Sequence, residues 1–299
     1  MSSSGYAAVR AVLTDPAFLV PTPQPPDAPS GVAWLRANVA RFSSGPAHAR
    51  RRAMVEDQLS TMDCQVLRGT ARSRTITTLA AAEGAPIDLM AAVARVLPTE
   101  LLAEALGLTG VRPATVAAIA RAYPTGAPDE DADRAVGELI TACGGAADEA
   151  TAARIGLLAQ AHDATAGLIG NAAFIMLRGA LPDPAEAILA ETLRHSPPVR
   201  ATKRTDATGT LVDLDLAAAN RDLAVFADPD RFDPRRENSS AHLDFGFGQH
   251  ACPGHHHATQ IAAGILDAVR GCRLLTENLR YSPSANLRIP AELVITRPA

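Results

Sequence analysis

The residues most able to do chemistry lie in the segment 245–254, FGFGQHACPG, where a single cysteine, Cys252, stands between glycines. Glycines let a backbone pass close to a flat cofactor because they carry no side chain. The residues after Gly254 have the apolar spacing of a helix, and the start of a helix favours negative charge on a nearby sulfur. This setting predicts a thiolate that binds a metal ion, with a structural cysteine in a turn as the alternative.

Four positions of this segment give the sequence its most specific resemblance to a known family. Phe245, Gly248, Cys252 and Gly254 have the identity and spacing of the heme-binding loop of the cytochrome P450 family, which the chain resembles from about Tyr6 to its C-terminus. The resemblance implies that the chain binds heme b, with Cys252 as the axial thiolate ligand of the iron. In this family the thiolate donates electron density to the iron and favours O–O cleavage.

Two further segments match the same family in the right order along the chain. Glu191-Thr-Leu-Arg194 resembles its Glu-x-x-Arg helix, and Arg231, after Pro229, resembles a later arginine that completes a Glu-Arg-Arg network. The resemblance implies charge-assisted hydrogen bonds that hold the segment before the cysteine, which is a structural role. Because residues three apart share a helix face, an ordinary surface ion pair is the alternative for Glu191 and Arg194.

Heme also carries two propionates, and the resemblance implies cations that bind them. The candidates are His48, Arg52, Arg204 and His250. His48 and Arg52 are four residues apart, so on a helix both side chains lie on one face. The alternative is a basic helix face that meets solvent. The arginines between these two positions are expected to face solvent, and they are Arg50 and Arg51.

The predicted helix over 155–177 corresponds to the oxygen-binding helix of the family, and it departs from the family pattern. The family's acid is kept as Asp163, a candidate proton relay, but its threonine is replaced by Ala164. Thr165 lies one position further and is rotated away. Counting back four residues from Ala164 places the Gln160 amide toward the same pocket. In the alternative interpretation, Gln160 and Thr165 exchange polar roles or the substrate supplies the missing hydroxyl.

The remaining histidines and cysteines give weaker signals. Consecutive side chains on a helix point about 100° apart, so the run 255–257, three histidines, does not share one face, and a second metal site is not expected there. Cys64, Cys143 and Cys272 are scattered and form no CxxC pair, which argues against a disulfide framework and a zinc-thiolate site. They are predicted to be partly or fully buried small residues.

The elements that position these residues are mainly helical. Alanine-rich segments with three- and four-residue apolar spacing predict helices across 61–178, and a further helix is expected at about 256–272. Residues near Thr210 and residues 287–290 and 293–296 favour short strands. The predicted fold is mainly α with small β-sheets, an N-terminally shortened cytochrome P450 fold in one domain over 1–299. We expect the shortening to leave the pocket open, or completed by a second subunit, a partner protein or a carrier-borne substrate.

Composition excludes several classes of function. The 299 residues carry 28 Lys+Arg against 32 Asp+Glu, a formal charge of −4, and only 4% are aromatic, which argues against nucleic-acid binding. The first residues lack the pattern of a secretory signal, and the longest apolar stretch, 164–177, is too short and too interrupted to cross a bilayer. The sequence therefore predicts a cytoplasmic protein without a membrane partner.

These observations lead to three hypotheses about function. The first is a heme-thiolate monooxygenase of specialised metabolism that acts on a small organic or carrier-bound substrate and takes electrons from a ferredoxin or flavodoxin-type partner. The second keeps the heme but uses peroxide, or performs a non-oxygenating rearrangement or bond formation, because Ala164 replaces the usual threonine. The third is a heme-poor auxiliary protein that supports a partner biosynthetic enzyme. Fold-level resemblance alone does not decide among them.

Overall fold

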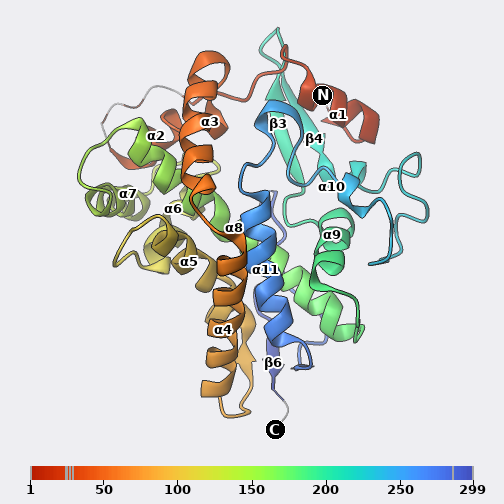
Figure 1. Cartoon of the computed structure of the whole chain (residues 1–299). Helices are drawn as coiled ribbons and strands as arrows, with labels where there is room; N and C mark the ends of the chain where they lie inside the picture. The colour runs from red at the N-terminus through yellow and green to blue at the C-terminus, as the bar shows by residue number, and fades with distance from the viewer. Residues whose placement is uncertain (1, 24–25, 27, 29, 285, 298–299) are drawn as a thin grey trace. The chain divides into compact units, whose positions relative to one another are not determined.

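The structure, a computed structural model, describes residues 2–23, 26, 28, 30–284 and 286–297, and it is mainly helical with two small β-sheets (Figure 1). Its internal contacts divide the chain into two compact units. Unit 1 contains Met1–Phe18, Cys64–Pro98 and Ala164–Ala299, and unit 2 contains Leu19–Asp63 and Thr99–Asp163. The boundary falls inside the longest helix, α8 (Glu149–Arg178), so each unit includes one part of it.

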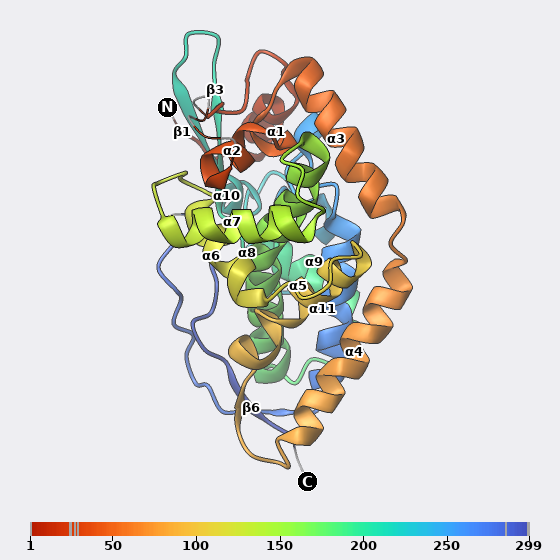
Figure 2. The same cartoon turned by 90° about the vertical axis from the view of Figure 1, so that its left-hand side faces the viewer.

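The helices of unit 1 include α11 (His255–Val269), which follows the cysteine loop, and α9 (Ala185–His195), which carries the Glu-x-x-Arg segment. Unit 1 also contains α1 (Tyr6–Thr14), α4 (Cys64–Ala81), η2 (Met90–Ala94), α10 (Leu216–Ala219), η3 (Ser239–Ala241) and η4 (Gly248–His250). α4 and α11 lie side by side, as both views show (Figures 1 and 2). A Cβ atom at Gly264 of α11 would collide with the Arg68 carbonyl oxygen on α4, so glycine permits this close approach.

One sheet of unit 1 lies beside the N-terminal helix. Its strand order is β1 (Ser2–Ser3), β4 (Leu211–Asp215), β3 (Ala201–Thr205), with β3 and β4 antiparallel and β1 parallel to β4. Val212 and Leu214 alternate with exposed residues along β4, and they pack with Val9 and Leu13 of α1 in one apolar cluster. Alternation with period two therefore fixes the face of β4 that α1 covers.

The second sheet of unit 1 joins distant parts of the chain. β2 (Ile87–Asp88) and β5 (Arg273–Leu274) both pair antiparallel with β6 (Val294–Thr296). Of the strands expected from sequence, those near Thr210 and over 293–296 are confirmed. Residues 287–290 form only isolated bridges, Val199 with Leu287 and Tyr281 with Pro290, because Pro290 has no backbone N–H for a ladder.

Unit 2 contains helices of 3 to 16 residues besides the first part of α8. They are α2 (Gly31–Ala37), η1 (Ala40–Phe42), α3 (Gly45–Ser60), α5 (Leu97–Ala105), which begins at the unit boundary, α6 (Pro113–Ala122) and α7 (Glu130–Ala142). Asp129 caps α7 by accepting a hydrogen bond from the Ala132 N–H, at 3.0 Å. In the next turn, Asp133 Oδ1 accepts from the Val32 N–H at 2.7 Å and so holds the start of α2 against α7.

The helices expected across 61–178 and near 256–272 are confirmed as α4 to α8 and α11. Among the described residues, no helix is both long enough and apolar enough to span a membrane. The expectation of a single domain over 1–299 stays a prediction.

Candidate functional site

The cysteine loop in unit 1 is fixed through its backbone. The Cys252 N–H donates to the Phe245 carbonyl oxygen at 2.8 Å, which closes the loop on itself. Gly246 and Gly248 both have φ +71°, a region that residues with a side chain rarely adopt. Gly254 precedes α11, so Cys252 stands ahead of the positive end of that helix. The Cys252 side chain is half-buried, and the loop therefore holds a positioned thiol.

Gly248 has a second reason to be glycine. A Cβ atom at this position would lie 2.9 Å from the carbonyl oxygen of Leu13, in α1, whereas the nearest described atom to a Cβ at Gly246 would be the His250 carbonyl oxygen, at 3.6 Å. The loop therefore passes directly over the backbone of α1 at Gly248. The Arg10 guanidinium, also on α1, lies 4.4 Å from the centroid of the Phe247 ring and adds a cation–π contact to the same junction.

Aromatic side chains surround the loop, and the ionisable groups before it favour their neutral forms. The Phe245 ring lies 5.7 Å from the His242 ring and 5.8 Å from the His255 ring. Burial, and next the charge on His255, lowers the pKa of His242 to about 4, so His242 is neutral at pH 7. Burial also raises the pKa of Asp244 well above its usual range. Burial therefore favours the uncharged forms of both His242 and Asp244, which precede Cys252.

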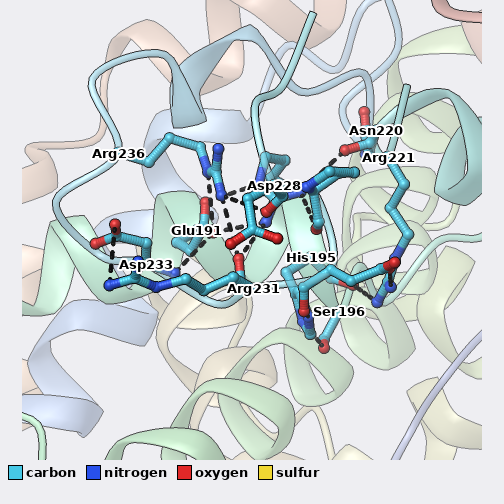
Figure 3. A network of polar contacts seen from close by, with 12 residues as sticks. Glu191, His195, Ser196, Asn220, Arg221, Asp228, Arg231, Asp233 and Arg236 are labelled. Atoms are coloured by element: carbon cyan, nitrogen blue, oxygen red, sulfur yellow. Dashed lines mark hydrogen bonds and ion pairs between the residues drawn. The ribbon is translucent and has the colours of Figure 1, made fainter. Parts of the chain in front are cut away.

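Glu191, which Figure 3 shows within a network of polar contacts, forms a buried ion pair with Arg194. Glu191 and Arg194 on α9 are fully buried, and Arg194 donates twice to the Glu191 carboxylate, at 2.8 and 2.6 Å. The Asp233 N–H donates to the same carboxylate at 2.9 Å. The expectation that Glu191 and Arg194 share a helix face is confirmed, and the surface ion-pair alternative is wrong because neither side chain is exposed.

Arg194 also binds the irregular segment that precedes the cysteine loop. Its guanidinium donates to the carbonyl oxygens of Asn220 at 3.2 Å, Pro229 at 2.8 Å and Arg231 at 3.1 Å. Charge-assisted bonds of this kind are the stronger hydrogen bonds in proteins. One buried side chain therefore supports three points of a segment that has little regular secondary structure.

The third arginine of the network is Arg236, and the assignment of Arg231 from sequence needs correction. Arg236 Nε donates to Glu191 at 3.2 Å, and its side chain is 9% exposed. The Arg231 side chain is 69% exposed and approaches Asp233 only at 3.9 Å. Arg231 contributes its carbonyl oxygen, which accepts from Arg194 and from Arg236. The irregular chain between these two arginines turns the second one inward, and local spacing does not reveal that turn.

Sequence reasoning missed Asn220, which links the network to the cysteine loop. Asn220 is fully buried, and its amide oxygen accepts from the Leu243 N–H at 2.7 Å, while its amide nitrogen donates to the Leu193 carbonyl oxygen at 3.3 Å. The available signal was a polar residue directly after the apolar run of α10. Buried amides of this kind need partners, so Asn220 joins α9 to the chain that enters the loop.

The four candidate propionate ligands fall in both units. Arg204, buried on β3, and His250, in η4, belong to unit 1 together with Cys252. His48 and Arg52, both on α3, belong to unit 2. Their joint binding of one cofactor therefore stays a prediction. Burial, and next the charge on Arg52, lowers the pKa of His48, which favours a neutral imidazole that donates one N–H.

The two arginines between His48 and Arg52 differ from each other. Arg50 is 54% exposed, but the Arg51 side chain is only 14% exposed, so the expectation that Arg51 faces solvent is wrong. Both donate to the Glu149 carboxylate at 2.8 Å, and Arg51 also donates to Ser43 Oγ at 2.5 Å. Glu149 is the first residue of α8, where a negative side chain suits the helix dipole.

The predicted oxygen-binding segment lies inside α8 and is split by the unit boundary. Gln160 donates its amide N–H to the Gly156 carbonyl oxygen at 2.9 Å, so this amide is bound to its own helix. Asp163, the last residue of unit 2 in this helix, has a side chain that is 27% exposed. Ala164 and Thr165 belong to unit 1, and Thr165 is buried. The structure thus gives Gln160 a local partner that spacing did not predict.

His162 is a buried residue of this segment that sequence reasoning passed over. Its Nδ1 lies 2.9 Å from the Thr99 hydroxyl, and its Nε2 lies 3.9 Å from Asp163 Oδ1. The imidazole therefore stands between α5 and the candidate proton relay. Among the described residues, no group of three or more histidine, cysteine, aspartate or glutamate side chains is placed to hold a metal ion.

Known proteins resemble this chain most specifically over α9 to α11. Residues 185–267 match the family described as Cytochrome P450. The chain is 32% identical over 172 residues to the biotin biosynthesis cytochrome P450 of Bacillus subtilis, which covers 50% of this chain and 43% of that protein. It is 35% identical over 144 residues to cytochrome P450 144 of Mycobacterium tuberculosis, covering 41% and 33%. The chain thus spans about a third to two-fifths of the length of these curated relatives.

Similar solved structures extend over nearly all of the chain. P450BioI in complex with hexadec-9Z-enoic acid ligated acyl carrier protein has a TM-score of 0.83 at 22% identity, covering 99% of this chain and 91% of that one. The Bacillus subtilis bacillaene polyketide synthase P450 PksS has a TM-score of 0.82 at 18% identity, covering 99% and 89%. At these identities the likeness concerns the fold, and it confirms the mainly helical architecture with small sheets.

Proposed function

We propose that this chain, which matches the cytochrome P450 family over residues 185–267 and has the fold of solved cytochromes P450, is a heme-thiolate oxidoreductase. The observation that carries the proposal is the cysteine loop. Its half-buried thiol is held by a closed backbone turn. The buried network of Glu191, Arg194 and Asn220 hydrogen-bonds to the chain that enters this turn. Burying these charged groups costs desolvation free energy, and their many hydrogen bonds are well suited to keep the cysteine sulfur in a fixed position.

The residues present fit a heme group. Heme needs one axial donor, a chain that can pass close to its face, and donors for its carboxylates. Cys252 supplies the thiol, and the loop around it has glycines at Gly246 and Gly248. The buried Arg204 and the imidazole of His250 supply N–H donors in the same unit.

Each of these groups has a proposed task. Cys252 Sγ would hold the iron, while His48, Arg52, Arg204 and His250 would bind the propionates. A thiolate-ligated heme, when bound, supplies oxidation chemistry that no side chain can perform. The partly exposed Asp163 carboxylate would pass protons between solvent and the pocket, since its side chain reaches water.

The finer proposal is a monooxygenase that acts on a small organic or carrier-bound substrate of specialised metabolism. The similar P450BioI structure holds an acyl carrier protein that bears a fatty acid, and this supports a carrier-bound substrate here. Electrons would come from a ferredoxin or a flavodoxin-type protein. A second subunit or a partner protein would complete the substrate pocket.

The deciding test is the absorption spectrum of the purified protein after reduction, with and without carbon monoxide. We expect a red-shifted Soret band typical of thiolate ligation in the wild type, and its loss in Cys252→Ala. Cys272→Ala is the matched control, because Cys272 is also a half-buried thiol of unit 1. Purification without heme, or an unchanged band in Cys252→Ala, would overturn the proposal and favour the auxiliary protein.

A second candidate keeps the heme but changes the oxidant. Ala164 offers no hydroxyl, and the Gln160 amide N–H that could serve in its place is bound to Gly156. These observations favour a peroxide-driven or non-oxygenating reaction. It predicts product from substrate and peroxide, or from substrate alone, without a reductase. Strict dependence on reductase and molecular oxygen would support the monooxygenase instead.

A further inference from the structure

A pocket of about 300 Å³ in unit 1 contains none of the candidate heme-binding or oxygen-chemistry residues. Its lining comes from the C-terminal half of α8, from Ser196 after α9, and from the chain around 278–288. Asn171, the first α8 residue in its wall, is seven positions beyond Ala164, which is about 10 Å along the helix axis. This pocket is therefore distinct from the segment of α8 assigned to oxygen chemistry.

Two arginines give the pocket its charge. Arg178 and Arg288 both line it, and its lining includes no aspartate or glutamate among the described residues. Arg178 donates to the backbone carbonyl oxygen of Glu277 at 3.0 Å and forms no ion pair with a described carboxylate. The Arg288 guanidinium forms neither a hydrogen bond nor an ion pair with the part of the chain that the structure describes. Two cations thus stand at one pocket, and no carboxylate of the described residues pairs with either of them.

Aromatic rings hold these guanidinium groups and give the pocket an apolar wall. The Arg288 guanidinium lies 4.5 Å from the centroid of the Tyr281 ring, and that of Arg178 lies 5.5 Å from the Phe174 ring. A guanidinium held against a ring keeps its planar set of N–H donors in place, and this arrangement suits a carboxylate. Ile175 and Leu279 continue the apolar wall beside the rings.

One residue of the pocket wall, Asn171, has a buried side-chain amide. Asn171 is 1% exposed, and its Nδ2 donates to the carbonyl oxygens of Ser196 at 3.2 Å and Arg288 at 3.1 Å. Because these two acceptors fix the amide orientation, Oδ1 must face the other way. Among the described residues no group donates to this buried oxygen. A polar group left in this state is one that water or a ligand satisfies.

We propose that this pocket binds a small organic carboxylate with an aromatic or short aliphatic body. Arg178 and Arg288 would bind the carboxylate, and Phe174, Ile175 and Tyr281 would contact the body. The pocket volume is at the lower end of the range for small-molecule sites, so the ligand must be small. The site is independent of the heme proposal, because none of its residues belongs to the cysteine loop or the buried network.

The test is a calorimetric titration of the purified full chain with benzoate, with benzyl alcohol as the uncharged analogue and inorganic phosphate as the second anion. We expect saturable binding of benzoate only. Arg178→Gln and Arg288→Gln should each weaken it at least tenfold, while Arg280→Gln, an exposed arginine outside the pocket, should change it less than twofold. Arg288→Lys should give an intermediate loss, because charge is kept but the planar donors are lost.

Several results would overturn the proposal. Benzoate that fails to saturate, or that binds equally well to Arg178→Gln and Arg288→Gln, would show that the arginines form no carboxylate site. Equal binding of benzyl alcohol would show that charge plays no part, and binding of phosphate in place of benzoate would overturn the ligand class. The Soret band of the heme-bound protein, recorded in the same titration, should not move. A benzoate-dependent shift of that band would place the ligand at the iron instead.

Discussion

Two regions contain the candidate functional residues, and their polar contacts differ. One is the segment that leads from α9 to the cysteine loop, and the other is the segment 160–165 of α8. Around Glu191 and Arg194, buried charges satisfy several backbone groups at once. Around Asp163, the polar contacts are few, and Gln160 binds its own helix. Several hydrogen bonds at once therefore hold the segment before the cysteine, whereas any chemistry at 160–165 of α8 depends on single side chains.

The largest effect is expected from breaking the buried ion pair. Arg194→Leu leaves the Glu191 carboxylate buried without its main partner, so we expect a loss of about 3–5 kcal/mol in the free energy of unfolding. Chemical denaturation measures this loss. Arg236→Gln should also destabilise the fold clearly, whereas the exposed Arg231→Gln should stay within about 0.5 kcal/mol. Equal losses for Arg231→Gln and Arg236→Gln would contradict the corrected network.

The next effect concerns the loop itself and uses two glycines with the same backbone angle. Gly246→Ala and Gly248→Ala share the strain of φ +71°, but only the second places a Cβ 2.9 Å from the Leu13 carbonyl oxygen. We expect Gly248→Ala to cost about 1–3 kcal/mol more in the free energy of unfolding, because backbone must shift to relieve the contact. Thermal and chemical unfolding of the two variants check the difference. Equal stability would show that α1 and the loop are not in close contact.

A smaller effect, in reactivity, is expected in α8. Ala164→Thr restores the hydroxyl that the family usually has, at a half-buried position next to Asp163. If the chain is a monooxygenase, the product formed per reductant consumed should rise, by up to about tenfold, which corresponds to about 1.4 kcal/mol. Thr165→Val is the control for removing a neighbouring hydroxyl. A drop in peroxide-driven turnover with no gain with reductase would instead support the second candidate function.

The smallest effect is expected at the start of α8. Hydrogen bonds from Arg50, and further contacts with Arg51, lower the pKa of Glu149 to about 2. A carboxyl whose folded-state pKa is depressed stabilises the fold above its unfolded pKa, near 4.5, and loses that contribution as the pH falls toward 2. Glu149→Gln should therefore cost about 0.5–1 kcal/mol at pH 7, and the difference from wild type should vanish by about pH 2. A difference that is constant from pH 7 to pH 2 would exclude the ion pair as its cause.

Much of the framework was predictable because it depends on short-range patterns. Glu191 and Arg194 share a face through helix periodicity alone, and the fixed spacing around Cys252 identified the loop. The helices across 61–178 followed from alanine content and apolar spacing. Each of these features is encoded within a few residues, so the sequence was sufficient.

Contacts between distant segments were not predictable in the same way. Arg236 replaces Arg231 in the network because the irregular chain over 228–238 has no period from which side-chain direction follows. Arg51 turns inward because Glu149, almost a hundred residues later, lies beside it. Asn220 and Asn171 clamp carbonyl groups that are close only in the folded chain.

By itself, the sequence indicated the resemblance to the cytochrome P450 family, the loop around Cys252 and the charged pair Glu191 and Arg194. The tertiary structure alone decided which arginine completes the network around that pair and which two arginines, Arg178 and Arg288, line a pocket in which the described residues supply no carboxylate. The physical reason is range. Helix periodicity and loop chemistry act over a few neighbouring residues, whereas burial and ion pairing depend on which distant segments meet.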